Sequence, residues 1–311
     1  MKTQKEIFMK AILFLFGTCF LFFPSLAQEQ DYPAIAPDIQ KRTFTFVERD
    51  SALELDFYQR RGDTEIRPCV IFLFGGGFFT GDRDRPFYNT YFNNLVHHGL
   101  NVASIDYRLG LNEEKFKELG IFNTTPLEDA VRMAVEDLYA ATVYLLGNAK
   151  ELKIDPQQFL LSGSSAGAVT SLQGDWHHRN NDPVAEMLPA DFAYQGVVAF
   201  AGAILSTTGK PKYDTPPGPV MMFHGTEDKV VPYNKLKLFN KGMFGSNYLA
   251  KYFHKQGFPY YFLRVVDAGH EIAGSPIYDN MAEILRFIET AILQNRTYQL
   301  EATLERLTGE Q

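Results

Sequence analysis

One serine stands in a context that could make it a nucleophile. The apolar run that begins at Phe159 leads into Gly163-Ser164-Ser165-Ala166-Gly167, which matches G-x-S-x-G with Ser165 at its centre. In this motif a strand turns sharply into a helix, and the serine is held at the tip with its Oγ exposed. The flanking positions are glycines because a side chain there would collide with the neighbouring strand or helix. Serine alone is a weak nucleophile, so a base and an orienting acid are required.

An acid and a base each follow a predicted strand farther along the chain. Asp228 comes shortly after the strand Pro219–His224, and His270 follows the last predicted strand, Tyr260–Val266, after a small residue and a glycine. Serine, acid and histidine in this chain order, each on a loop at the C-terminal end of a strand, form a known catalytic arrangement. The sequence therefore predicts a triad of Ser165, Asp228 and His270.

Other residues compete for the two partner roles. Glu227 is the alternative acid, and a solvated acidic turn is the alternative interpretation of Gly225-Thr226-Glu227-Asp228. The chain has 7 histidines, of which only His270 has both the order and the placement that the base requires. The others precede the serine, follow its helix, precede Asp228 or stand in an expected loop before the last strand: His97, His98, His177, His178, His224 and His254.

A glycine-rich turn could bind a developing oxyanion. The predicted strand ending at Phe74 is followed by three glycines, which let backbone amides approach a tetrahedral intermediate closely. We expect Gly76 and Gly77 to donate, together with Ala166 directly after the nucleophile. A nucleotide-binding loop is the competing interpretation, but G-x-G-x-x-G fails at Thr80 and no G-K-[ST] follows. Neither a C-x-x-C motif nor a zinc spacing of histidines is present.

Strands and helices alternate along the chain in the way a mainly parallel sheet requires. The apolar run Cys69–Phe74 is typical of a buried parallel strand, and Thr125-Pro126-Leu127-Glu128 predicts the capped start of the best helix. Further strands are expected at Thr43–Val47, Leu53–Tyr58, Leu100–Asp106 and Gly196–Ile204, and further helices at Phe87–His98, Tyr233–Met243 and Asp279–Leu293. This alternation predicts an α/β fold with helices on both faces of the sheet.

Both ends of the chain are expected to lie outside the folded domain. Three lysines precede the apolar run Ala11–Phe23, and Ser25-Leu26-Ala27 follows as a small-x-small site, which is the layout of a secretory signal peptide. Because the residues before Cys19 depart from a lipobox, we favour cleavage after Ala27 and a secreted or periplasmic protein over a lipoprotein anchor. We expect residues 28–40 to be a flexible lead-in, residues 41–295 to be one domain, and residues 296–311 to be a C-terminal tail, of which Glu301–Gln311 is charged and helical or frayed.

The composition fits one exported globular domain. The chain has 311 residues, 45% of them hydrophobic, and a formal net charge of -7 without a basic block, which argues against a nucleic-acid surface. Loss of residues 1–27 would leave Cys69 as the only cysteine, within an apolar run that indicates a buried thiol and no disulfide. No later stretch is long and apolar enough for a stable membrane span. No pattern in the sequence specifies an oligomeric state.

Taken together, these pieces resemble the α/β-hydrolase esterases and lipases. In chain order they are Phe74-Gly75-Gly76-Gly77-Phe78, Asp106-Tyr107-Arg108, the turn 163–167, His224-Gly225-Thr226-Glu227-Asp228 and Gly269-His270. The resemblance covers about Val70 to about Ala291. It implies a mostly parallel eight-stranded sheet with a short cap, ester hydrolysis through an acyl-enzyme on Ser165, and no metal or organic cofactor.

The resemblance is divided between two groups of that family. The oxyanion loop and Asp106-Tyr107-Arg108 resemble the hormone-sensitive-lipase-like carboxylesterases, whereas the surroundings of Asp228 and His270 look more like acetyl- and feruloyl-esterases or prolyl peptidases. The loop of the first group usually begins with histidine, which supports the glycine turn by hydrogen bonds. Phe74 stands there in this chain, so the support of the loop must differ.

The substrate is predicted from the setting of the site. The segment from about Gly174 to Gln195 is too short for a large lid. Aromatic residues near the nucleophile could form a wall beside Ser165, with ordinary packing as the alternative for each: Phe78, Phe79, Trp176, His177, His178 and Tyr194. An exported enzyme with such an open pocket suits small esters or the acetyl and feruloyl esters of plant polysaccharides.

Three alternatives use the same residues or the same fold. A prolyl peptidase or aminopeptidase would share the triad, but it normally carries a propeller or cap domain for which this chain has no room. A lactone or dienelactone hydrolase would also share it. A non-catalytic binding protein on this fold is the remaining alternative.

Overall fold

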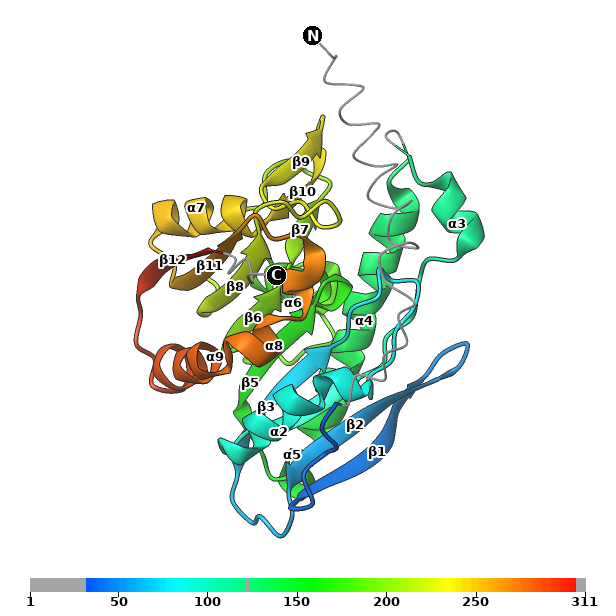
Figure 1. Ribbon diagram of the computed structural model, residues 1–311. Coiled ribbons are helices and arrows are strands. Elements are labelled where there is room, and N and C mark those ends of the chain that lie inside the picture. The colour runs from blue at the N-terminus through cyan, green and yellow to red at the C-terminus, as the bar shows by residue number, and fades with distance from the viewer. Residues whose placement is uncertain (1–31, 121–122, 306–311) are drawn as a thin grey trace.

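A computed structural model describes residues 32–120 and 123–305 (Figure 1). The expected signal peptide, with Cys19 and the cleavage site after Ala27, lies outside the described residues. Within those described ranges no helix combines the length and the apolar character needed to cross a membrane.

Nine strands form one mixed sheet in the order β1-β2-β4-β3-β5-β6-β8-β11-β12. β1 pairs antiparallel with β2, β2 pairs antiparallel with β4, and every other neighbouring pair is parallel. The bounds are β1 (Ile39–Glu48), β2 (Ala52–Arg60), β3 (Arg67–Leu73), β4 (Asn101–Ile105), β5 (Ile154–Ser164), β6 (Gly196–Phe200), β8 (Val220–Gly225), β11 (Tyr260–Val266) and β12 (Gln299–Glu305). The structure confirms the predicted α/β class, with one strand more than the expected eight.

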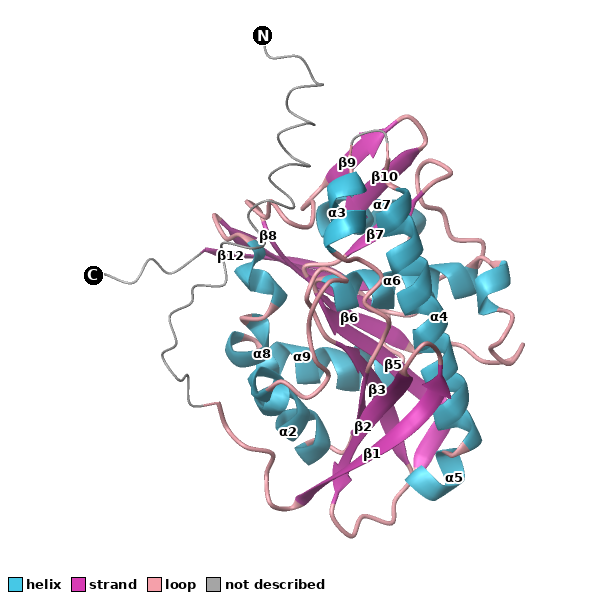
Figure 2. Ribbon diagram, turned by 90° about the vertical axis from the view of Figure 1, so that its right-hand side faces the viewer, coloured by secondary structure: helices cyan, strands magenta, loops and turns pink. Residues whose placement is uncertain are grey.

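Helices cover both faces of this sheet. Figure 2 shows α2, α8 and α9 on one side and the long α4 with α6 on the other. The bounds are η1 (Pro86–Tyr88), α2 (Asn89–His97), α3 (Glu113–Glu118), α4 (Thr125–Gly147), α5 (Ala149–Leu152), α6 (Ala166–Arg179), η2 (Pro183–Ala185), α7 (Ser246–Gln256), η3 (His270–Ala273), α8 (Pro276–Asp279), α9 (Met281–Phe287) and the π-helical turn η4 (Ile288–Leu293). α4 begins where predicted. The threonine that contacts Glu128 is Thr124, just before the helix, and not Thr125, because the Thr124 hydroxyl donates its proton to Glu128.

The central strands are apolar along nearly their whole length because helices cover both of their faces. Every residue of β4, β6 and β8 is buried, and Cys69 on β3 is a fully buried free thiol, as predicted. Burial of one large apolar side chain stabilises the fold by about 1.5–3 kcal/mol. β8, the strand that leads to Asp228, is therefore held in the apolar interior along its whole length.

The helix expected at Tyr233–Met243 is wrong, because this segment forms a hairpin. β9 (Lys235–Leu238) and β10 (Lys241–Gly245) pair antiparallel around Phe239, which has a positive φ of 52°. The alternation Lys235-Leu236-Lys237-Leu238 has the period of a strand, and this signal outweighs the helical propensity of lysine and leucine. The helix of this region is α7, so His254 lies in a helix and not in a loop.

The strand expected at Gly196–Ile204 divides into two. β6 ends at Phe200, Ala201 has a φ of 54°, and β7 (Ala203–Ser206) leaves the main sheet to pair with β10. The resulting three-stranded sheet, β7-β10-β9, continues from the carboxyl end of β6. It supplies a small cap from a part of the chain that the sequence had not indicated.

Both ends of the described chain are ordered parts of the fold. Residues 32–38, expected to be flexible, lie along α2, where Asn93 accepts from the Ala36 amide and donates to the Ala34 carbonyl. The expectation of a helical or frayed tail is wrong for Glu301–Glu305, because these residues belong to β12, which pairs in parallel with β11 along seven residues. The strand that leads to His270 is thereby flanked on both sides.

Candidate active site

Ser165 occupies a strained turn between β5 and α6. Its backbone has φ 50° and ψ −114°, and its amide donates to the Phe200 carbonyl at 2.9 Å. A Cβ on Gly167 would lie 2.0 Å from the Leu73 carbonyl oxygen, and a Cβ on Gly163 would lie 2.3 Å from the Gly167 carbonyl oxygen. Both glycines are therefore steric requirements of this turn, as the motif predicts, and the strain is held by the surrounding packing.

The structure brings Ser165, His270 and Asp228 into one hydrogen-bonded chain. The Ser165 hydroxyl lies 2.8 Å from His270 Nε2, and His270 Nδ1 lies 2.8 Å from Asp228 Oδ2. A carboxylate can only accept, so Nδ1 carries the proton and Nε2 is free to accept from the serine. This arrangement can take a proton from Ser165 as its oxygen attacks an electrophile.

Both oxygens of Asp228 are fully engaged. Oδ1 accepts from the amides of Val230 and Val231 at 2.8 and 3.0 Å, and Oδ2 faces His270 and the buried His224. Burial raises the pKa of Asp228, but the donors His224 and His270 outweigh it and hold the pKa well below its usual range. The group is therefore an anion at neutral pH. Glu227, the alternative acid, is not part of this chain of hydrogen bonds.

The glycine loop after β3 lies directly against the nucleophile. A Cβ on Gly75 would lie 3.3 Å from the Ser165 Cβ, and the Gly75 amide is engaged because it donates to the Tyr88 hydroxyl. Among the described residues, no protein acceptor is recorded for the amides of Gly76, Gly77 or Ala166. These are the three amides that the sequence predicts as oxyanion donors; Ala166 directly follows Ser165, and Gly76 and Gly77 follow Gly75 in the loop that meets Ser165.

A family model matches the part of the chain that holds the nucleophile and the glycine loop. The BD-FAE model covers residues 55–209. This chain belongs to the BD-FAE family of carboxylic-ester hydrolases. No curated protein matches the sequence.

Solved structures of other esterases share the fold of this esterase at low identity. Est2 of the planctomycete Thermogutta terrifontis has 21% identity and a TM-score of 0.59, with 84% of this chain and 95% of that chain covered. Esterase B of Lactobacillus rhamnosis has 15% identity and a TM-score of 0.62, with 94% and 97% covered. A fungal esterase of Rhizomucor miehei has 17% identity and a TM-score of 0.58, with 84% and 86% covered.

Aromatic packing replaces the expected histidine in support of the oxyanion loop. The Phe74 ring stacks on Tyr107 with 4.4 Å between centroids, and a Cβ on Gly81 would lie 2.5 Å from the same ring. The Tyr107 hydroxyl donates to the Phe74 carbonyl at 2.7 Å. Burial raises the pKa of Tyr107 well above its usual value, so the phenol keeps the proton that it donates. The support of the loop does differ, as Phe74 requires.

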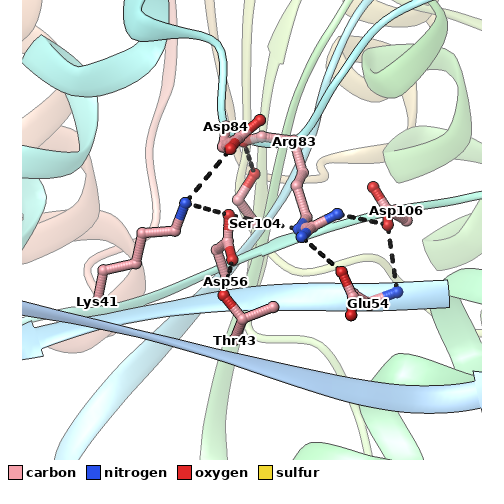
Figure 3. A network of polar contacts seen from close by, with 8 residues as sticks. All are labelled: Lys41, Thr43, Glu54, Asp56, Arg83, Asp84, Ser104 and Asp106. Atoms are coloured by element: carbon pink, nitrogen blue, oxygen red, sulfur yellow. Dashed lines mark hydrogen bonds and ion pairs between the residues drawn. The ribbon is translucent and has the colours of Figure 1, made fainter.

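A charged network holds the far end of the same loop (Figure 3). Arg83 pairs with Asp106 at 2.7 Å, with Glu54 at 2.8 Å and with the fully buried Asp56 at 3.3 Å. Ser104 donates its hydroxyl proton to the Arg83 carbonyl at 2.7 Å. Removal of one partner of such a buried pair leaves an uncompensated charge, so the network fixes one arrangement of the loop.

The segment Asp106-Tyr107-Arg108 now has a structural role for each of its residues. Asp106 binds Arg83, Tyr107 binds the Phe74 carbonyl, and Arg108 binds the fully buried Asp137 on α4 at 2.9 Å. The sequence showed this motif, but it did not show that the motif fastens the glycine loop to the sheet and to α4.

The structure does not bring the predicted aromatic wall to Ser165. Trp176 and His177 stand 11 and 12 residues after Ser165 on α6, and a helix rises about 1.5 Å per residue, so they lie about 17 Å away. Trp176 donates to the Lys212 carbonyl, and His177 contacts Gln173 and Asp182. Tyr194 is fully buried before β6, with its hydroxyl 2.8 Å from Thr142. Phe78 lies in the oxyanion loop, but it is 4% exposed and packs on Tyr107.

Three residues of the site were missed or set aside. Tyr88 has no motif that marks it, and the motif that contains Tyr107 does not reveal its role, because both roles depend on contacts between distant segments. His224 was set aside because it precedes the acid, although its place at the end of a buried strand could have indicated it. In the described part of the chain no group of three or more His, Cys, Asp or Glu side chains could hold a metal ion.

Replacement of Tyr107 by phenylalanine tests the support of the oxyanion loop. Tyr107→Phe keeps the stack on Phe74 and removes the hydroxyl that donates to the Phe74 carbonyl. One such hydrogen bond contributes about 0.5–1.5 kcal/mol, so we expect kcat for p-nitrophenyl acetate to fall about 3- to 10-fold with little change in KM. Steady-state kinetics measure both parameters.

Tyr139→Phe is the matched control. Tyr139 is also buried and donates to a backbone carbonyl, that of Gly174, at 2.7 Å, but between α4 and α6. We expect it to lower the melting temperature and leave kcat unchanged. Equal losses of kcat in the two variants, or none in Tyr107→Phe, would contradict a role for Tyr107 in the loop.

Proposed function

We propose that this esterase acts through an acyl-enzyme on Ser165. The observation that carries the proposal is the continuous hydrogen-bonded chain from Ser165 through His270 to Asp228, at 2.8 Å for each link. The glycine loop meets Ser165 at Gly75, which supports the amides of Gly76, Gly77 and Ala166 as the oxyanion donors that we propose. An ester hydrolase requires these two features and needs no metal.

Each step follows from the geometry. Ser165 Oγ attacks the ester carbonyl carbon while its proton passes to His270 Nε2, and the carbonyl oxygen becomes an oxyanion that the three amides bind. The bond to the leaving oxygen then breaks, and the alcohol takes the proton from Nε2. Water attacks the acyl-enzyme by the same route and releases the acid and the free serine. Asp228 holds the ring of His270 and stabilises its charged form.

The substrate that we propose is an acetyl or feruloyl ester of a plant polysaccharide. BD-FAE is a family of feruloyl and acetyl xylan esterases, and the family model covers Ser165 and the glycine loop. Structures of the similarly folded T. terrifontis esterase 2 contain bound propionate and butyrate, which supports short acyl groups.

A panel of esters tests this substrate class. We expect release of acetate from acetylated xylan or of ferulate from feruloylated arabinoxylan, hydrolysis of p-nitrophenyl acetate, and a steep loss of rate as the acyl chain is lengthened. Ser165→Ala is the control and should lower kcat by about 10⁶-fold, to the background rate. Chromatography of the released acids measures the products.

Two results would contradict the proposal in different ways. Hydrolysis of simple acyl esters without any release from xylan would remove the polysaccharide substrate and leave the mechanism. A Ser165→Ala protein with the activity of the wild type would remove the mechanism. Faster cleavage of prolyl or aminoacyl amides than of esters would favour a peptidase.

We propose further that the protein is exported after cleavage behind Ala27. The support is the basic, apolar and small-residue layout of residues 1–27. The N-terminal sequence of protein collected from the periplasm or the medium should begin at Gln28. Full-length protein found only inside the cell would contradict export.

A further inference from the structure

His224, a buried histidine behind the triad, contacts the same carboxylate oxygen as the base. Its Nε2 lies 3.3 Å from Asp228 Oδ2, while His270 Nδ1 lies 2.8 Å from that atom on the other side. The His224 ring is 0% exposed. Water therefore does not compete for either of its nitrogens, and each must be satisfied by the protein.

The neighbours of His224 determine which nitrogen carries the proton. Nε2 faces two acceptors, the Asp228 carboxylate and the Val231 carbonyl at 3.1 Å, so it must be protonated. Nδ1 lies 2.8 Å from the hydroxyl of Ser246, the first residue of α7. In a neutral ring Nδ1 accepts, and Ser246 can donate to it. The Ser246 hydroxyl is farther, 3.4 Å, from its other acceptor, the Gly202 carbonyl.

Few charged groups surround this pair. The loop after β8 brings Glu227 and Lys229 next to Asp228, and β11 places Arg264 in register with His224, where it pairs with Glu301 of β12. β6 and the first turn of α7 carry no charged residue. The Tyr233 ring packs edge-on against the imidazole at 5.7 Å. His224 and His270 each place a ring nitrogen beside Asp228 Oδ2, at 3.3 and 2.8 Å.

We propose that His224 is a positioning residue for catalysis, which holds Asp228 Oδ2 toward His270 by a second N–H donor whose tautomer Ser246 fixes. The inference rests on the proposed roles of Ser165, His270 and Asp228. The amides of Val230 and Val231 hold Oδ1, and His224 holds Oδ2. The carboxylate therefore has one orientation and offers Nδ1 of His270 a fixed acceptor.

Loss of the His224 N–H should shift the pH dependence of catalysis in one predictable direction. A carboxylate with fewer donors keeps more of its negative charge and stabilises a protonated His270 more strongly. Protonated His270 cannot accept the proton of Ser165. The acid limb of the kcat/KM profile should therefore move to higher pH, and kcat should fall because the carboxylate can rotate.

Four variants of the full chain test this inference on p-nitrophenyl acetate from about pH 5 to about pH 9. His224→Leu should lower kcat about 10- to 100-fold, with KM nearly unchanged, and move the acid limb up by about one pH unit. His224→Gln places an amide N–H where Nε2 was and should recover most of kcat and the original limb. Ser246→Ala removes the hydroxyl that fixes the tautomer of His224. It should lower kcat and move the acid limb to higher pH, as His224→Leu does, but by less.

Phe223→Leu is the matched control, because it also replaces a buried ring of β8 by leucine. Phe223 is equally buried, on the opposite face of the strand, where it stacks on Phe200. It should lower the melting temperature without a change in the acid limb. Should His224→Leu fail to fold, Ser246→Ala and His224→Gln decide the question by the same two readouts.

The inference is overturned if His224→Leu has the kcat and the acid limb of the wild type. It is also overturned if His224→Leu loses kcat without a shift of the acid limb and His224→Gln does not recover that kcat. Either result would mark a merely structural histidine. Failure of the proposed function would look different, because wild type and Ser165→Ala would then hydrolyse the ester equally.

Discussion

The architecture of the site depends on close backbone contact at the nucleophile turn. A Cβ on Gly167 would lie 2.0 Å from the carbonyl oxygen of Leu73, and a Cβ on Gly75 would lie 3.0 Å from Ser164 Oγ. The end of β3, the end of β5 and the start of α6 can therefore meet only because side chains are absent. This contact places the amides of the glycine loop beside Ser165, and it holds Ser165 at a φ of 50°. A site of this kind needs rigid strands on either side, which the apolar interior of the sheet provides.

Two sets of buried polar contacts transmit that rigidity to the reacting groups. On one side, Tyr107 donates to the Phe74 carbonyl, and Arg83 is bound in the charged network of Figure 3, so that the oxyanion loop is fastened at both ends. On the other side, two backbone amides and two imidazoles surround the carboxylate of Asp228. Inside a protein such contacts are stronger than in water, and together they restrict the geometry of the groups that they surround. These two sets of contacts thus hold the loop beside Ser165 and the carboxylate beside His270.

The sequence predicted those parts of the site that local sterics and chain order dictate. The Ser165 turn and the strands before Asp228 and His270 could be read from glycines, apolar runs and spacing, whereas the oxyanion role of the amides of Gly76, Gly77 and Ala166 stays a prediction. The parts that were missed depend on contacts between distant segments, such as Tyr107 with Phe74 and His224 with Asp228. The aromatic residues of α6 do not form the predicted wall beside Ser165, because Ser165 precedes the N-terminus of this helix and the helix carries Trp176 away from it. In the fold, the hairpin at β9 and β10 and the edge strand β12 were missed, because amphipathic and charged segments take their structure from the neighbour they pair with.

The most direct measurement of the central claim is the position of a covalent label. The wild-type protein is treated with a fluorophosphonate, digested, and the modified peptide is sequenced by mass spectrometry. We expect a single phosphonyl adduct on Ser165, formed slowly or not at all in His270→Ala, because the Ser165 hydroxyl lies 2.8 Å from the base His270. An adduct on Ser164 or on a serine elsewhere, or the absence of any adduct on an enzyme that hydrolyses esters, would contradict the assignment of Ser165 as the nucleophile.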